Sequence, residues 1–258
     1  MGVVDLDRGT EERQDIHELE RSARSMRAAA LCAIHAGRSG HPGGSLSIMD
    51  VCAALYLNVA RHCPRKPDWE DRDRIFFSAG HKAPALYSAL AHAGYFPIKD
   101  IMSFRRYGSM FQGHPHRLKT PGVEVSSGSL GQGLGIAVGA ALGARLSGRS
   151  SRMYCIMGDG EQQEGSVWEA AMSAGHFGLD NLCAIVDRNR LQIDGRTGDV
   201  MSLEPLEDKY RSFGWHVITC DGHDMGRLLS AFGEAASTKG KPTVIVADTV
   251  KGKGVSFM

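Results

Sequence analysis

The sequence has no long hydrophobic run, and this excludes a membrane-spanning helix. Its longest stretch of small apolar residues, Gly133 to Ala144, has twelve residues, whereas a helix that crosses a bilayer needs about twenty. The first fifteen residues are polar and charged, so they contain no apolar core of a secretory signal. We therefore expect a protein of the cytoplasm with no membrane partner.

Cysteine pairs and blocks of one charge are also missing. The six cysteines lie far apart without C-x-x-C spacing, which excludes a zinc site of that kind and a disulfide framework. Several stand in apolar runs, where cysteine acts as a small hydrophobic residue, so we expect reduced thiols in the core. The 30 basic and 29 acidic side chains give a net charge of +1 and are spread along the chain. This balance excludes a general nucleic-acid binder.

What the sequence does contain is a regular alternation of short apolar runs and helical stretches. Runs that are hydrophobic throughout are typical of parallel strands covered on both faces. We predict an α/β fold in one domain: a three-layer, mostly parallel sheet with helices on both faces. The predicted strands are 74–78, 153–157, 183–186, 216–220 and 243–247, and the predicted helices are 15–35, 47–59, 84–93, 166–176, 205–213 and 225–239.

Polar residues follow two of these strands where they end. Gly158-Asp159-Gly160 follows one strand and Asn189 follows the next. Ligands bind outside the carboxyl ends of parallel strands, so Asp159 and Asn189 lie side by side if their strands are neighbours. Their oxygens and the carbonyl of Leu191 suit Mg²⁺, with Ca²⁺ or Mn²⁺ as alternatives, when phosphate oxygens complete the shell. Gly158-Asp159-Gly160 alone is more often a plain strand-to-helix turn, but Asn189 favours the metal site.

Three histidines stand in segments that contain Gly or Pro: His41, His81 and His114. A single histidine in a loop is usually solvated. Three at predicted loop ends favour a cluster suited to polyol and phosphate recognition and to proton transfer near neutral pH.

Together these segments resemble the diphosphate-binding half of transketolase, a thiamine-diphosphate enzyme. The resemblance runs from about residue 20 to the end. It implies a thiamine-diphosphate-binding fold, with residues 1–258 forming a single diphosphate-binding domain that has an N-terminal helical segment. The segments that carry it are Ser39-Gly40-His41-Pro42-Gly43-Gly44, Ser78-Ala79-Gly80-His81, Gly113-His114-Pro115, residues 121–133, and Gly158-Asp159-Gly160 with Asn189.

The resemblance implies a role for each matching residue. His41 and His114 face the sugar hydroxyls and the reacting carbon as catalytic residues, and His81 lies near the cofactor diphosphate. The loop Gly128-Ser129-Leu130 touches the thiazolium, although the family more often has Pro where this chain has Ser129. The remaining cofactor-binding residues are Gly158, Asp159, Gly160, Glu164 and Asn189, and the metal ligands are Asp159, Asn189 and Leu191.

Three further features have two interpretations each. By resemblance, Glu164 joins a carboxylate network across a dimer interface; otherwise it is a charge in the first turn of a helix, as we expect for Glu161. Gly135, Gly139 and Gly143 recur on one helix face, which favours close helix packing and would also suit a subunit interface. Lys251 follows the last strand and would reach a phosphate there, but a solvated tail is favoured.

The resemblance also implies that this chain does not act alone. The pyrimidine-binding and C-terminal domains are absent, so we expect its partner in an α2β2 assembly to be a C-terminal transketolase subunit, which would hold most phosphate-binding residues. Such a split transketolase transfers a two-carbon ketol unit from a ketose phosphate to an aldose phosphate. The chain stops before a further active-site histidine of the family, so either that residue is replaced or the sequence is truncated. The alternatives are another thiamine-diphosphate enzyme, of the 2-oxoacid dehydrogenase or deoxyxylulose-phosphate synthase type, or a non-catalytic diphosphate-binding module.

Overall fold

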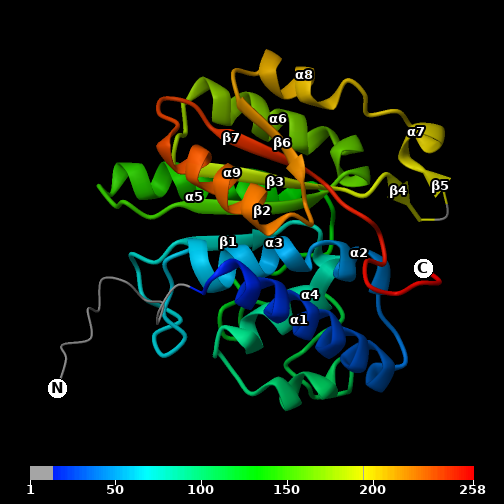
Figure 1. The fold of residues 1–258 in the computed structure, drawn as a ribbon. Coiled ribbons are helices and arrows are strands. Elements are labelled where there is room, and N and C mark those ends of the chain that lie inside the picture. The colour runs from blue at the N-terminus through cyan, green and yellow to red at the C-terminus, as the bar shows by residue number, and fades with distance from the viewer. Residues whose placement is uncertain (1–13, 194) are drawn as a thin grey trace.

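Five parallel strands form the central sheet of the computed structural model, which describes residues 14–193 and 195–258 (Figure 1). The expectation of no secretory signal concerns mainly residues 1–13, which lie outside this part. The strand order is β1-β2-β3-β7-β6. This architecture confirms the predicted α/β fold class. The strands are β1 (Arg74–Phe77), β2 (Met153–Gly158), β3 (Leu182–Arg188), β6 (His216–Asp221) and β7 (Thr243–Asp248).

Helices cover both faces of this sheet, as the unbroken hydrophobic runs predict. Alternate residues of β2 enter two separate cores: Tyr154 and Ile156 face one side, and Met153, Cys155 and Met157 face the other. On the first side lie α1 (Ile16–Gly37), α3 (Met49–Ala54), α4 (Ala83–His92) and α9 (Met225–Ser237), and on the second lie α5 (Gln132–Leu146), α6 (Gly165–His176) and α8 (Leu206–Ser212).

The helix predicted over 47–59 has different bounds. It begins earlier, with α2 (Pro42–Ser47), because proline favours the first turn of a helix. Ile48 separates α2 from α3, and the last turn, η1 (Leu55–Val59), is a π-helix that ends with the amide of Ala60 donating to the carbonyl of Leu55 at 2.9 Å. The early start places His41 directly before a helix.

Short elements and loops connect these layers. The long irregular loop between η3 (Ile98–Ser103) and α5 carries both His114 and Gly128. No helix in the described part of the chain is long and apolar enough to span a membrane. The remaining elements are η2 (Gly80–Lys82), η4 (Gly160–Gln163), α7 (Thr197–Val200) and the hairpin strands β4 (Leu191–Gln192) and β5 (Gly195–Arg196).

The glycine face of α5 corrects one expectation. A Cβ atom at Gly135, Gly139 or Gly143 would meet no atom within 4 Å, so this face packs against nothing in the described part of the chain. The opposite side of α5, with Leu134 and Ala141, is the side buried in the core. The interpretation as close helix packing within the chain is therefore wrong.

The cysteines are free thiols, as expected, but the expectation that they lie in the core is wrong for Cys32, which is exposed, and for Cys63, which is half-buried. Cys52, Cys155, Cys183 and Cys220 are buried. Burial raises the pKa of Cys183 to about 12 and that of Cys220 to about 11, because the thiolate is poorly solvated there. These four side chains therefore act as small core residues.

Candidate functional site

The pairing of β2 with β3 brings Asp159 and Asn189 to the same edge of the sheet. Gly158 is in register with Asp187, so the residues that follow each strand lie side by side. Asp159 is only 3% exposed. Its Oδ1 accepts from the amide of Gly160 at 2.8 Å, and its Oδ2 accepts from the amide of Arg190, directly after Asn189. The carboxylate is thus fixed in position between the two strand ends.

Asn189 is oriented by its own neighbours. Its Oδ1 accepts from the amide of Leu191 at 3.1 Å, and its Nδ2 lies 3.4 Å from an oxygen of Asp187. Leu191 begins the short strand β4. The turn that leads there holds Arg190 at a φ of 63°. A carboxylate, an amide oxygen and a backbone carbonyl therefore come from one turn and the adjacent strand end.

This donor set fits a hard divalent cation that is shared with a phosphate ligand. Burial raises the pKa of Asp159, and the nearby charge of Asp187 adds to the shift, so a cation beside Asp159 would offset an unfavourable buried charge. No group of three or more His, Cys, Asp or Glu side chains in the described residues could hold a metal. The three oxygens of Asp159, Asn189 and Leu191 are fewer than the six that Mg²⁺ takes, so ligand oxygens of a diphosphate would suit the rest of the shell.

The three histidines do come together. The ring centroids of His41 and His81 are 5.6 Å apart, and those of His41 and His114 are 6.2 Å apart. They come from three separate segments: the residue before α2, the turn η2, and the long loop before α5. The sequence analysis predicts that these histidines cluster, and the distances show that the rings do lie close together.

Electrostatics keep two of these rings neutral near pH 7. Burial lowers the pKa of His81 to about 3, with a further contribution from Lys82. Burial also lowers the pKa of His41, helped by the positive charge of Arg105 and by His114. A neutral imidazole has one ring nitrogen free to accept a proton or a hydrogen bond.

The loop Gly128-Ser129-Leu130 borders this cluster. A Cβ at Gly128 would lie 3.5 Å from Cγ of His114, so the backbone runs along that ring. A Cβ at Gly80 would lie 2.7 Å from the amide nitrogen of Gly128. Glycine at position 80 therefore allows η2, with His81, to contact the loop directly.

A buried ion pair that the sequence analysis missed lies beneath the site. Lys82 and Asp187 pair at 1% and 0% side-chain exposure. Ser47 also donates to Asp187 at 2.6 Å, and Thr249 donates to its other oxygen. This network joins η2, α2, β3 and the end of β7. The feature of the sequence that could have indicated this ion pair is the carboxylate of Asp187 in the apolar run of β3.

Glu161 is the clearest correction at the site. The sequence predicts a plain helix charge, but Glu161 is 2% exposed and joins three separate segments. Its carboxylate accepts from Ser78 Oγ, from the amide of Gly131 at 2.8 Å and from the amide of Gly158 at 2.9 Å. Glu164, in contrast, is exposed and makes no side-chain cap hydrogen bond at the start of α6.

Lys251 also differs from the favoured interpretation as a solvated tail. A Cβ at Gly43 would lie 2.9 Å from Cγ of Lys251, and the amide of Gly252 donates to the carbonyl of Gly43 at 3.0 Å. The last turn of the chain therefore packs against the segment that carries His41.

Comparison with known proteins identifies the family. Residues 19–257 match the family model described as transketolase, thiamine diphosphate binding domain. The chain belongs to the transketolase family. Among solved transketolases, that of Leishmania mexicana superposes with a TM-score of 0.88 at 39% identity, over 92% of this chain and 37% of that one. That of Campylobacter jejuni gives 0.89 at 34% identity, over 94% and 39%. The chain thus spans less than two fifths of these solved transketolases.

Other transketolase relatives match over most of their own length. The 6-deoxy-6-sulfo-D-fructose transketolase subunit SqwG of Clostridium sp. (strain MSTE9) is 47% identical over 93% of this chain and 87% of the relative. An apulose-4-phosphate transketolase subunit of Phocaeicola vulgatus is 41% identical over 94% and 86%. The predictions of family and enzyme class are confirmed: this is a transketolase-type transferase subunit with a thiamine diphosphate binding domain.

Proposed function

We propose that this chain, as a single diphosphate-binding domain, is the N-terminal subunit of a split transketolase in the cytoplasm. It would take part in the transfer of a two-carbon ketol unit from a ketose phosphate to an aldose phosphate. The observation that carries the proposal is the arrangement of residues at one edge of the sheet. There Asp159 and Asn189 are fixed side by side after β2 and β3. His41, His81 and His114 form a cluster next to these strand ends.

The names of the relatives support an anionic sugar as substrate. One relative is named for a sulfonated fructose and another for apulose 4-phosphate. The sulfonate of the first sugar and the phosphate of the second are both anionic near pH 7. We therefore propose a sugar with such a group as the substrate of this chain.

We assign the cofactor residues as follows. Asp159, Asn189 and the carbonyl of Leu191 would hold Mg²⁺, with Ca²⁺ or Mn²⁺ as alternatives, against the diphosphate. When bound, thiamine diphosphate would supply the nucleophilic and electron-accepting chemistry that transfer of a ketol unit requires. Gly158 and Gly160 leave backbone room beside the metal, and Gly128-Ser129-Leu130 would contact the thiazolium.

The histidines would handle the sugar. His41 and His114 would face its hydroxyls and the reacting carbon. The lowered pKa of His41 keeps a ring nitrogen free to accept a hydroxyl proton near pH 7. His81, half-buried and neutral, would donate or accept a hydrogen bond at the diphosphate without adding charge.

The partner would be a C-terminal transketolase subunit that contributes the pyrimidine-binding half of the site in an α2β2 assembly. Relatives that this chain matches over most of their length are named as subunits, which supports a partner. In that assembly, Glu164, which is exposed here, would join a carboxylate network across the interface.

Reconstitution tests this function. The purified chain should transfer no ketol unit alone, and addition of the subunit encoded by a neighbouring gene should restore transfer between a ketose phosphate and an aldose phosphate. Turnover by the single chain would contradict the split arrangement. Decarboxylation of pyruvate by the pair, without ketol transfer, would instead indicate a 2-oxoacid dehydrogenase component.

A further inference from the structure

A fully buried amide side chain lies beside the proposed metal site. Gln162 stands only three residues after Asp159, in the turn η4 that follows β2, yet solvent does not reach it. Its Nε2 donates to the carbonyl oxygen of Gly158 at 2.9 Å and lies 3.7 Å from the sulfur of Met157. A polar side chain is costly to bury unless its hydrogen bonds are made. Gln162 makes one of them to the residue directly before Asp159.

The other end of this amide is held by α8. Tyr210, which is also fully buried, donates its hydroxyl to Oε1 of Gln162 at 2.6 Å. Burial raises the pKa of Tyr210 well above its ordinary value, so the hydroxyl keeps its proton and remains a donor. The rings of Trp168 and Trp215, each with its centroid 5.3 Å from that of Tyr210, pack around it. The hydrogen bonds therefore run without a break from α8 to Gly158.

These bonds orient the peptide group that joins Gly158 to Asp159. Its carbonyl accepts from Gln162, and its N–H, which belongs to Asp159, donates to the carbonyl of Asp187 at 3.3 Å. Steric contact adds little, since in the described part of the chain a Cβ at Gly158 would meet one atom beyond its chain neighbours, Cβ of Glu161 at 3.9 Å. Glycine adopts many backbone conformations. Hydrogen bonds, more than packing, therefore set the direction in which the Asp159 side chain leaves the backbone.

We propose that Gln162 and Tyr210 are positioning residues of the cofactor site: through the carbonyl of Gly158 they aim the Asp159 carboxylate at a divalent cation bound with a diphosphate. This inference rests on the proposed function and deepens it. Both side chains are fully buried, so they act through Asp159 and not by contact with the ligand. Mg²⁺ requires nearly ideal octahedral geometry, whereas Ca²⁺ accepts irregular arrangements. A firmly aimed carboxylate therefore favours Mg²⁺ over Ca²⁺ at this site.

Calorimetry on the complex of this chain with the C-terminal subunit tests the proposal. Binding of thiamine diphosphate is measured once with Mg²⁺ and once with Ca²⁺. Gln162→Met keeps an unbranched side chain of similar length and removes both hydrogen bonds. It should weaken the Mg²⁺-dependent binding about tenfold or more, as is typical when the partners that orient metal ligands are lost. The Ca²⁺-dependent binding should weaken less, so the preference for Mg²⁺ should fall.

Tyr210→Phe is the milder variant. It removes only the hydroxyl, so Gln162 can still donate to Gly158 but is no longer anchored to α8. The preference for Mg²⁺ should fall in the same direction and by less. Should Gln162→Met fail to fold, Tyr210→Phe decides the proposal by the same criterion.

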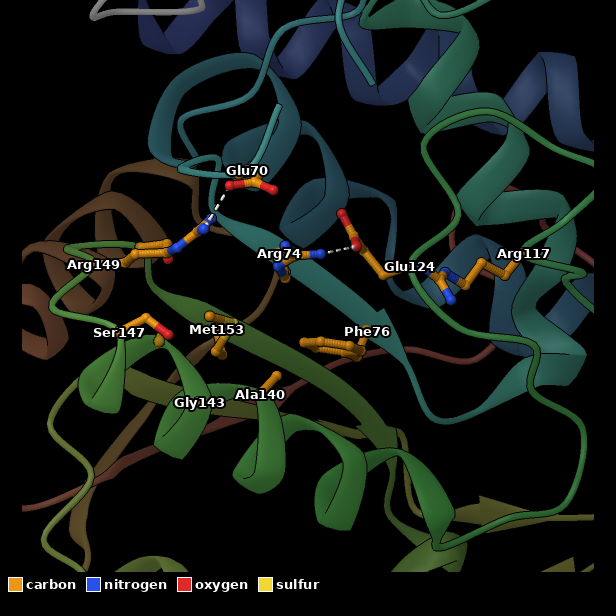
Figure 2. A pocket seen from close by; sticks show the side chains of 12 residues that line it. Glu70, Arg74, Phe76, Arg117, Glu124, Ala140, Gly143, Ser147, Arg149 and Met153 are labelled. Atoms are coloured by element: carbon orange, nitrogen blue, oxygen red, sulfur yellow. Dashed lines mark hydrogen bonds and ion pairs between the residues drawn. The ribbon is translucent and has the colours of Figure 1, made fainter. Parts of the chain in front are cut away.

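A buried carboxylate at the other end of the sheet provides the control. Glu124 lines a cavity of about 420 Å³ together with Arg74 and Met153, the first residues of β1 and β2, and Figure 2 shows its ion pair with Arg74. It accepts two hydrogen bonds from Arg72 at 2.8 Å each and one from Arg74 at 3.2 Å. From its first to its last residue β2 spans roughly 16 Å, which separates this end from Asp159. Glu124→Gln should lower the free energy of unfolding, measured in urea, and leave the preference for Mg²⁺ unchanged.

The outcomes separate this inference from the proposed function. A fall in the preference for Mg²⁺ in both variants, with none in Glu124→Gln, supports the positioning role. A fall confined to Gln162→Met overturns the role of Tyr210. An unchanged preference in both variants, or an equal fall in the control, overturns the inference and leaves the proposed function intact. If the unsubstituted complex binds thiamine diphosphate without any divalent cation, the proposed metal site fails, and the inference fails with it.

Discussion

Lys82 and Asp187 form an ion pair with both side chains fully buried, between the turn that carries His81 and the strand that leads to Asn189. The attraction of Lys82 holds the pKa of Asp187 below its ordinary value despite the burial. The pair therefore couples the histidine cluster to the proposed metal site through one electrostatic contact.

Removal of one member of this pair should be costly. Lys82→Met leaves a buried carboxylate without its cation and should lower the free energy of unfolding by about 3–5 kcal/mol. Urea denaturation measures this. The double variant Lys82→Met/Asp187→Asn should be less destabilised than the sum of the two single variants, and strict additivity would show that the pair is not coupled.

Glu161 and Glu164 offer a matched comparison of two nearby carboxylates. Glu161→Gln replaces an acceptor of three hydrogen bonds with a group that has one acceptor atom, and should cost about 2–3 kcal/mol of unfolding free energy. Glu164→Gln removes an exposed charge and should change it by about 0.5 kcal/mol or less. Equal effects in thermal or urea unfolding would contradict the assigned role of Glu161.

Asp159 can be tested by binding. Asp159→Ala should weaken Mg²⁺-dependent binding of thiamine diphosphate to the assembled enzyme about 100-fold or more, because the only carboxylate of the proposed metal ligand set is lost. Circular dichroism should show an intact fold. Unchanged affinity by calorimetry would remove Asp159 from the site.

His81 should make the protein less stable in acid. Its pKa is about 3 in the folded chain, against an ordinary value of 6.5. Between these values the unfolded chain holds the extra proton, so this contribution is fully present above pH 6.5 and is lost as the pH falls. The slope from this group is about 1.4 kcal/mol per pH unit.

The variant His81→Asn should flatten that dependence between pH 6 and pH 4 by about this slope. Lys82, His41, His114 and Asp187 are the charged and titratable groups that act on His81, and they remain in the variant. Unfolding at pH 8 isolates the packing effect of the substitution. An identical acid dependence in parent and variant would contradict a neutral His81 in the folded chain.

Gly139 and Gly175 should respond oppositely to alanine. Gly139 lies inside α5 with open space around it, so Gly139→Ala should raise the unfolding free energy of the isolated chain by about 0.5–1 kcal/mol. A Cβ at Gly175 would lie 1.8 Å from the carbonyl oxygen of Phe213, so Gly175→Ala should destabilise strongly. If the glycine face of α5 meets another subunit, Gly139→Ala should also weaken the assembly in sedimentation experiments.

The sequence predicted much of the fold because its strands are buried on both faces. Each strand is a continuous apolar run, and each predicted strand matches an observed strand to within two residues at either end. The positions of Asp159 and Asn189 followed from one rule, since residues after adjacent parallel strands share an edge.

Contacts between distant segments could not be predicted in this way. Glu161 has the sequence context of a first-turn helix charge, and its burial depends on Ser78, 83 residues earlier, and on Gly131, 30 residues earlier. The glycines of α5 form the stripe expected for packing, yet the tertiary structure leaves that face uncovered within the described chain.

The sequence by itself thus determined the order of strands and helices along the chain, because the local hydrophobic pattern decides which segments are buried. That order also indicated the edge of the sheet where parallel sheets bind their ligands. The tertiary structure alone decided which charges meet there. Lys82 and Asp187 are 105 residues apart, and Ser78 and Glu161 are 83 residues apart. Charges that are distant in the sequence become partners only when the chain folds, so a local sequence pattern cannot show which charges will pair.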